Sequence, residues 1–221
     1  MSLSLVGNNA IAVMAAAETA KELGYNPVIL GTEIEGEASE IARVYVAMAQ
    51  YLQKQNDDDS KSGLAGQYAM AKLPAAIIGG GETTVSLPKN NSGIGGRNQE
   101  LALASAVAMR SARLRQIVLA SVGTDGSDGP TDAAGGMVDG GTLDRLPGNP
   151  LDYLSRHDAY NYLVQEESSG VSPLVKVSSV IAPRNFFWKM KPLLPCSCQK
   201  TGPTGTNVAD VCITLVQKKL I

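Results

Sequence analysis

A glycine-rich loop that opens directly into an expected helix is the first segment of this sequence that could bind a ligand. Gly95, Gly96 and Arg97 stand at the start of a helix expected over residues 98–113. The first amide groups of a helix lack partners within it and carry about half a positive charge, so they attract anions. Arginine adds two parallel donors for a carboxylate or phosphate. The segment predicts an anion site at Gly95, Gly96, Arg97 and Asn98, the alternative being a loop capped by Asn98 with Arg97 in solvent.

A second candidate is the loop at residues 123–135, which is rich in aspartate and glycine. An EF-hand would need a bidentate glutamate at its twelfth position, and counting from Asp125 that position is a glycine. Mg²⁺ takes one or two carboxylates with phosphate and water, and a carboxylate can also accept the proton of an alcohol. The loop predicts catalytic and Mg²⁺-binding roles for Asp125 and Asp128, and substrate or phosphate contacts at Thr131 and Asp132. The residues do not single out a base among the three aspartates, and a structural turn is the alternative.

Three weaker signals lie elsewhere in the sequence. Glu82 follows three glycines at the end of an expected strand and predicts a substrate contact, although a structural turn explains it equally well. Thr204 and Thr206 lie in a glycine–threonine run that suits an anion or a plain turn. His157 stands beside an aspartate and could act as a base, but the pattern favours a partly buried histidine without a catalytic role.

The composition of the chain argues against several classes of protein function. The 221 residues carry 19 Lys and Arg against 21 Asp and Glu, with three Cys and one His. This balance, with no long basic stripe, argues against nucleic-acid binding. No apolar run reaches the ~20 residues of a membrane helix, and the start of the chain does not read as a signal peptide. So few Cys and His argue against a disulfide framework or a zinc site. The sequence predicts a soluble protein of the cytoplasm.

Helical and strand patterns alternate along the chain, which predicts an α/β fold with a layered parallel or mixed sheet flanked by helices. Ligands bind beyond the carboxyl ends of strands in such sheets, where the Glu82, Gly95 and Asp125 loops are expected. Helices are expected at residues 9–23, 37–55 and 98–113, and strands at residues 27–30, 75–78, 83–87, 116–122 and 211–216.

Four sequence blocks carry a resemblance to a known family. They lie at residues 80–85, 95–103, 123–135 and 201–208, and the order and spacing of the first three match the family pattern. Together they resemble the C-terminal half of glycerate 2-kinase, the MOFRL domain. The resemblance covers about residues 4–165 and 200–217 of this sequence.

The resemblance implies an activity, cofactors and partners. It implies ATP- and Mg²⁺-dependent phosphorylation of D-glycerate to 2-phosphoglycerate, in a cleft between two α/β domains. Arg97 would grip the glycerate carboxylate or the transferring phosphate. The chain would supply the C-terminal half of the site, be inactive alone, and need the N-terminal domain of the family or a second copy as partner. A non-catalytic binding or scaffold module derived from that domain is the alternative function.

The resemblance also divides the chain. Residues 1–65 are expected to be a helix-strand-helix segment that bridges from the N-terminal domain, and residues 66–221 to be the MOFRL-like domain. Residues 166–199 depart from the family pattern and are expected to be a peripheral insertion without a catalytic group. If a native N-terminus precedes this sequence, mitochondria are the alternative location.

Overall fold

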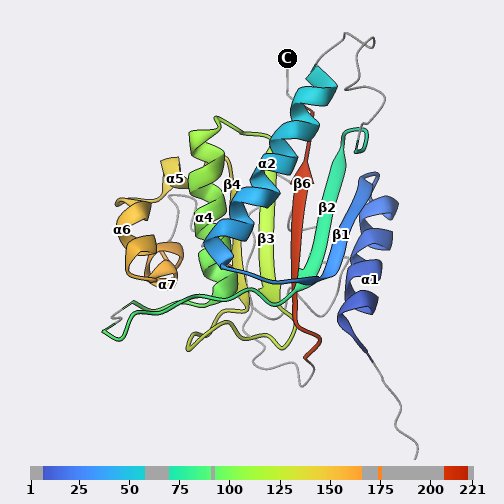
Figure 1. Ribbon diagram of the computed structural model, residues 1–221. Helices are drawn as coiled ribbons and strands as arrows, with labels where there is room; N and C mark the ends of the chain where they lie inside the picture. Colours follow the sequence, from blue (N-terminus) through green and yellow to red (C-terminus); the bar gives the residue numbers. More distant parts are fainter. Residues whose placement is uncertain (1–6, 58–69, 91–92, 166–173, 176–206, 219–221) are drawn as a thin grey trace, which may run out of the picture.

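The structure is a computed structural model that describes residues 7–57, 70–90, 93–165, 174–175 and 207–218 (Figure 1). Its helices are α1 (Asn9–Glu22), α2 (Ala38–Asp57), α4 (Arg97–Ser111), α5 (Thr142–Arg145), α6 (Pro150–Ser155) and α7 (Ala159–Leu163). Its strands are β1 (Asn26–Ile34), β2 (Ala75–Gly81), β3 (Ile117–Gly123), β4 (Gly135–Asp139), β5 (Leu174–Val175) and β6 (Asp210–Val216).

The strands form one six-stranded mixed sheet in the order β1-β2-β6-β3-β4-β5. Strands β1 and β2 are parallel, and every other neighbouring pair is antiparallel. Strands β1, β2 and β3 therefore run in one direction, so their carboxyl ends meet at the same edge as the first residues of β4 and β6. Helix α4 follows β2 and begins at this edge (Figure 1). The expected α/β class with a mixed sheet is confirmed.

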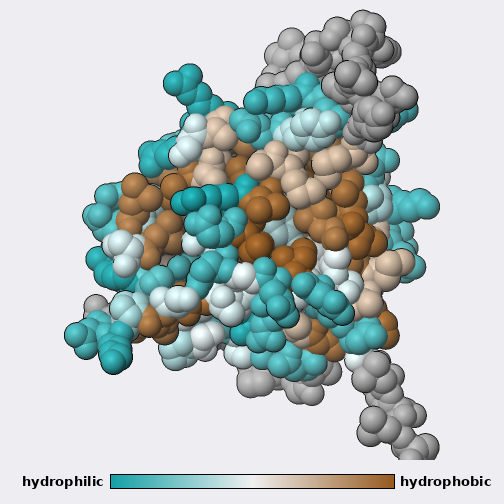
Figure 2. Space-filling view, in the orientation of Figure 1, coloured by the Kyte–Doolittle hydropathy of each residue, from teal (hydrophilic) through white to brown (hydrophobic). Residues whose placement is uncertain are grey.

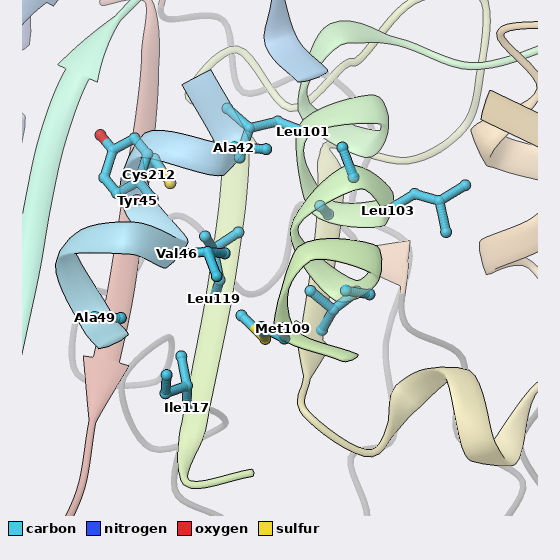
Figure 3. Packing of buried hydrophobic residues seen from close by; sticks show 14 of the residues in the cluster. Ala42, Tyr45, Val46, Ala49, Leu101, Leu103, Met109, Ile117, Leu119 and Cys212 are labelled. Atoms are coloured by element: carbon cyan, nitrogen blue, oxygen red, sulfur yellow. The ribbon is translucent and has the colours of Figure 1, made fainter. Parts of the chain in front are cut away.

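Helices cover the sheet on both faces. Helix α1 packs on one face of the sheet, and its predicted ends are confirmed. The Asn8 side chain accepts a hydrogen bond from the Ile11 amide at the start of the helix, and Gly24 follows its end in a left-handed conformation with φ 85°. Helices α2 and α4 cover the other face, where Tyr45 and Met109 pack over the sheet (Figure 3). Figure 2 shows apolar surface on this side of the molecule between α2 and the β1 edge. The helices thus hold the sheet from both sides and leave its polar edge for the loops.

One expected strand is wrong. Residues 83–87 form a single bridge, between Glu37 and Thr84, rather than a strand. The chain beyond β1 becomes helix α2 at Ala38, so only one residue of the extended segment finds a backbone to pair with. Strand β4 was not expected, because its sequence contains two glycines and only two apolar residues.

Two further expectations concern the division of the chain. The boundary near residue 65 lies outside the described residues, and elements on both sides of it share one sheet. Within the expected insertion at residues 166–199, only Leu174–Val175 is described, as strand β5 beside β4. Among the described residues, no helix is long and apolar enough to cross a membrane.

Candidate functional site

A cleft of about 730 Å³ opens at the edge where β1, β2 and β3 end. Its lining comes from the segments that follow β1 and β2, the start of α4, and the loops after β3 and α6. Five ionisable side chains lie in its lining: Glu35, Glu82, Arg97, Glu100 and His157. The sheet topology thus brings together residues that are more than 120 positions apart in sequence.

Arg97 is held at the cleft by two carboxylates. Its Nε and Nη2 donate to the two oxygens of Asp210, the latter at 3.0 Å, and its Nη1 lies 3.0 Å from Glu82 Oε1. Asp210 is buried at the start of β6, whereas the Glu82 side chain is 61% exposed. The Asp210 carboxylate raises the pKa of Arg97, so the guanidinium stays charged. The buried pair fixes one side of the guanidinium, and the Nη1 side faces the exposed carboxylate.

The start of α4 is occupied by the protein's own carboxylate. Asp128, which is 3% exposed, accepts hydrogen bonds from the amide of Asn98 at 3.0 Å and the amide of Gln99 at 2.8 Å. A Cβ on Gly96 would lie 2.3 Å from the Asp128 carboxyl carbon, so this close approach requires glycine. Asp128 therefore caps α4 from a distant loop and satisfies amides that would otherwise attract a ligand anion.

A buried hydrogen-bond network extends from this cap. Asn98 Nδ2 donates to Asp128, and Asn98 Oδ1 accepts from Ser121 Oγ at 2.6 Å. Gln99 Nε2 donates to the Asp128 carbonyl and to Thr131 Oγ1, at 3.0 and 2.9 Å. Burial raises the pKa of Asp128 to about 6, although the amides of Asn98 and Gln99 act in the opposite direction. The structure thus places Asn98, Asp128 and Thr131 in the packing between α4 and the loop after β3.

The other aspartates of this loop lie apart from the cap. Asp125 is half-buried and accepts a hydrogen bond from the Ser127 amide at 3.0 Å, and the exposed Asp132 accepts one from Tyr160 Oη at 2.8 Å. Both carboxylate oxygens of Asp128 are engaged by α4, which does not suit a Mg²⁺ ligand. No group of three or more His, Cys, Asp or Glu side chains in the described part of the chain could hold a metal. The Mg²⁺-binding role predicted for Asp125 and Asp128 stays a prediction, in which Asp125 is the less engaged of the two carboxylates.

A buried carboxylate in the first turn of α4 and the single histidine of the chain meet in the lining of the cleft. Glu100 is 5% exposed, and its two oxygens lie 2.9 and 3.2 Å from His157 Nδ1. Burial raises the pKa of Glu100, and the hydrogen bond to His157 opposes that rise. This pair resembles the arrangement in which a carboxylate orients a catalytic imidazole.

Comparison with known proteins identifies the domain. The MOFRL family model matches residues 75–179. A D-glycerate 2-kinase of Thermotoga maritima is 37% identical over 98% of this chain and 42% of its own length. A crystal structure of the Thermotoga maritima glycerate kinase has a TM-score of 0.71 at 36% identity, over 97% of this chain and 42% of that one. A glycerate 2-kinase of Pyrococcus horikoshii is 31% identical over 97% of this chain and 39% of its own length.

The chain belongs to the glycerate 2-kinase family and carries its MOFRL domain. It spans about two fifths of the length of the curated relatives that it matches.

The predicted site residues of this MOFRL domain separate into three groups. Glu82, Gly95, Gly96 and Arg97 line the cleft. The second group takes part in the loop and cap hydrogen bonds described above: Asn98, Asp125, Asp128, Thr131 and Asp132. Thr204 and Thr206 lie outside the described residues. The structure therefore brings the expected arginine and glycines into the cleft lining, which contains none of the three expected aspartates.

Sequence analysis missed three polar residues that the MOFRL domain places at the site. Asp210 directly precedes the expected last strand, and nothing local indicates its pairing with Arg97 across 113 positions. Glu100 offered a usable signal, because it lies three residues after Arg97 and so shares its face of the helix. His157 was noticed but weighed as a residue without a catalytic role, since its partner Glu100 lies 57 positions away.

Proposed function

We propose that this chain supplies the C-terminal half of a glycerate 2-kinase active site, which transfers the γ-phosphate of ATP to D-glycerate and forms 2-phosphoglycerate. One observation carries the proposal: in a chain related to glycerate kinases, a charged arginine, held in place by a buried carboxylate, lines an open cleft at the carboxyl edge of the sheet. This edge is where ligands bind in open α/β sheets.

Arg97 is the residue that we assign to the substrate. Asp210 engages Nε and Nη2, so the guanidinium cannot rotate away, and Nη1 is turned to the exposed Glu82. The carboxylate of D-glycerate would take up the position of Glu82 on Nη1 or share that nitrogen with it. An exposed ion pair of this kind is worth little, about 0–1 kcal/mol, so an anionic ligand can compete with it.

The charges in the cleft support a half-site rather than a whole one. Three carboxylates, of Glu35, Glu82 and Glu100, lie in the lining against the one guanidinium of Arg97. Glycerate and ATP are both anions, and phosphoryl transfer needs positive charge to neutralise the equatorial oxygens of the γ-phosphate. Further cationic groups are therefore expected from outside the described lining. In the proposed complex, Mg²⁺ would supply such charge on the phosphates, and we assign it no ligand among the described residues.

A complementation assay tests the proposal. ATP-dependent formation of 2-phosphoglycerate is measured for this chain alone and for this chain mixed with the N-terminal part of the Thermotoga maritima relative, which it does not match. We expect turnover only in the mixture, abolished by Arg97→Ala and kept by Arg110→Ala. Arg110 is the control because it lies on the same helix, 53% exposed at the far end. If neither D-glycerate nor ATP binds in either sample, the chain is a non-catalytic binding module instead.

A further inference from the structure

The pairing of His157 with Glu100 engages only one of the two nitrogens of the imidazole ring. Nδ1 is engaged by the buried Glu100 carboxylate, whereas Nε2 makes no hydrogen bond among the described residues. The imidazole is 22% exposed and shares the cleft lining with Arg97. A carboxylate on Nδ1 favours the tautomer with the proton on that nitrogen, which leaves Nε2 as an acceptor. The cleft thus contains a proton acceptor beside the arginine assigned to the substrate.

The backbone at His157 adds an independent observation. His157 follows α6 with φ 53°, the left-handed conformation in which helices commonly end on glycine. Its amide donates to the Leu154 carbonyl and the next amide donates to the Tyr153 carbonyl, the pattern of a Schellman motif. A non-glycine residue there costs roughly 1 kcal/mol. The same geometry is found at Arg113 after α4, so it does not indicate a use for the imidazole, but it fixes where the imidazole stands beside the cleft.

The loop before α4 locks this segment against the cleft. The Ile94 amide donates to the buried Asp158 carboxylate at 2.9 Å, and the Tyr160 amide donates to the Ile94 carbonyl at 3.0 Å. A Cβ on Gly93 would lie 2.0 Å from the Arg156 carbonyl oxygen, so the backbone segments at Gly93 and Arg156 are in close contact. His157 is therefore fixed relative to Gly95, Gly96 and Arg97 by backbone contacts on both of its sides.

We propose that His157 is the general base for the 2-hydroxyl of D-glycerate, with Glu100 as the positioning residue; this inference rests on the function proposed above. The hydroxyl O–H bond breaks as its proton passes to Nε2. The freed oxygen forms a bond to the γ-phosphorus of ATP while the bond from that phosphorus to the β–γ bridging oxygen breaks, and ADP leaves. The proton on Nε2 then passes to water. Glu100 accepts a hydrogen bond from Nδ1–H throughout and stabilises the imidazolium.

The single histidine makes a direct spectroscopic test available, because every imidazole signal of the chain belongs to His157. In ¹⁵N-labelled protein at pH 8, the spectrum should show the Nδ1–H tautomer with Nε2 unprotonated. D-glycerate should shift the Nε2 signal saturably, whereas 3-hydroxypropanoate, which has no 2-hydroxyl, should not. Glu100→Ala should shift the tautomer toward Nε2–H. The Nε2–H tautomer in the wild type would overturn the proposal, because Nε2 would then be a donor.

Calorimetric titration of D-glycerate distinguishes a failure of the base role of His157 from a failure of the function proposed for the chain. Binding with an unmoved imidazole signal would overturn the base role and leave the proposed function standing. An absence of D-glycerate binding both to the chain alone and to the complemented mixture would overturn the proposed function, and the base role with it.

A glycine variant provides a kinetic arm in the complemented assay. His157→Gly should fold well because glycine relieves the left-handed strain, and melting temperature checks this. We expect kcat to fall by about 10²–10⁴ with KM for D-glycerate nearly unchanged, and added imidazole to restore part of it. Glu100→Ala should lower kcat less. A wild-type kcat in His157→Gly would overturn the proposal.

Discussion

The Asp128 cap of α4 and the Glu100–His157 pair each join a buried carboxylate to nitrogen groups, yet they differ in how much bonding capacity they leave unused. At the start of α4, the amides of Asn98 and Gln99 are both bonded to the buried Asp128 carboxylate. In the second arrangement, Glu100 in the first turn of α4 holds one nitrogen of His157, and the other nitrogen makes no bond within the described residues. Arg97 lies between the two and is engaged on one side by Asp210.

The difference teaches that a motif of ligand-binding type is not itself a ligand site. The glycines and free amides at a helix start suit an incoming anion, but here a carboxylate of the chain itself fills that position. What marks a site is a polar group whose bonding capacity the fold leaves partly unused beside open space. By this criterion we propose Arg97 and His157 as site residues, and Asp128 as part of the structure that supports them.

The largest expected effect concerns the Asp128 cap of α4 and is a change in the free energy of unfolding with pH. The pKa of Asp128 is raised to about 6 in the folded protein and lies near 3.9 when unfolded, so between these values the native state holds more protons than the unfolded state. This group therefore lowers the free energy of unfolding by about 3 kcal/mol as pH rises from about 4 to 6, and adds no further change above.

Denaturant titrations from pH 4 to 8, comparing the wild type with Asp128→Asn, measure this contribution. The difference in unfolding free energy between the two should change with pH below about 6 and become constant above. A pH-independent difference would show that Asp128 is not the buried, proton-binding cap.

Loss of Arg97 should give the next largest effect, on the open side. Arg97→Ala removes a charge-assisted contact to the substrate carboxylate and should weaken D-glycerate binding by about 1.5–3 kcal/mol. It also leaves the buried Asp210 without its partner, so the double variant Arg97→Ala/Asp210→Asn should recover stability but not affinity. Arg110→Ala should bind D-glycerate as the wild type does. Equal calorimetric affinities for Arg97→Ala and Arg110→Ala would remove Arg97 from the site.

Two aspartate variants in the loop after β3 compare the stability that Asp128 and Asp125 each contribute. Asp128→Ala takes the acceptor away from two helix amides and should destabilise the fold by about 1–2 kcal/mol at pH 7. Asp125→Ala loses one hydrogen bond within its own turn and should cost about 0.5 kcal/mol. Thermal unfolding of both variants checks the order. A larger loss for Asp125→Ala would contradict the assignment of the cap to Asp128.

The smallest expected effect concerns the exposed partner of Arg97. Glu82→Gln removes the carboxylate that competes with the ligand for Nη1, and should strengthen D-glycerate binding two- to fivefold, about 0.4–1 kcal/mol. The gain should shrink at high salt, because exposed charges are screened. Glu40→Gln, which removes an exposed carboxylate paired with Arg43 on α2, is the control. Weaker binding in Glu82→Gln would mean that Glu82 itself contacts the substrate.

Local sequence patterns predicted the elements around the site but not the pairings across it. The helix from residue 98 and the strands before Glu82 and Asp125 were found because their apolar periodicity is a local property. The pairing of Arg97 with Asp210 depends on β6 lying between β2 and β3, an order that periodicity does not encode. The cap by Asp128 was missed for a related reason: a loop aspartate has no core pattern, and its burial arises only when the loop meets α4.

The most direct test of the account is the position of D-glycerate in a crystal structure of this chain at saturating ligand. The account predicts a glycerate carboxylate on Arg97 Nη1 within the cleft, with the 2-hydroxyl at hydrogen-bond distance from His157 Nε2, and the Asp128 cap unchanged. Glycerate bound in the loop of Asp125 and Asp128, with the Asp128 carboxylate displaced from the start of α4, would contradict it.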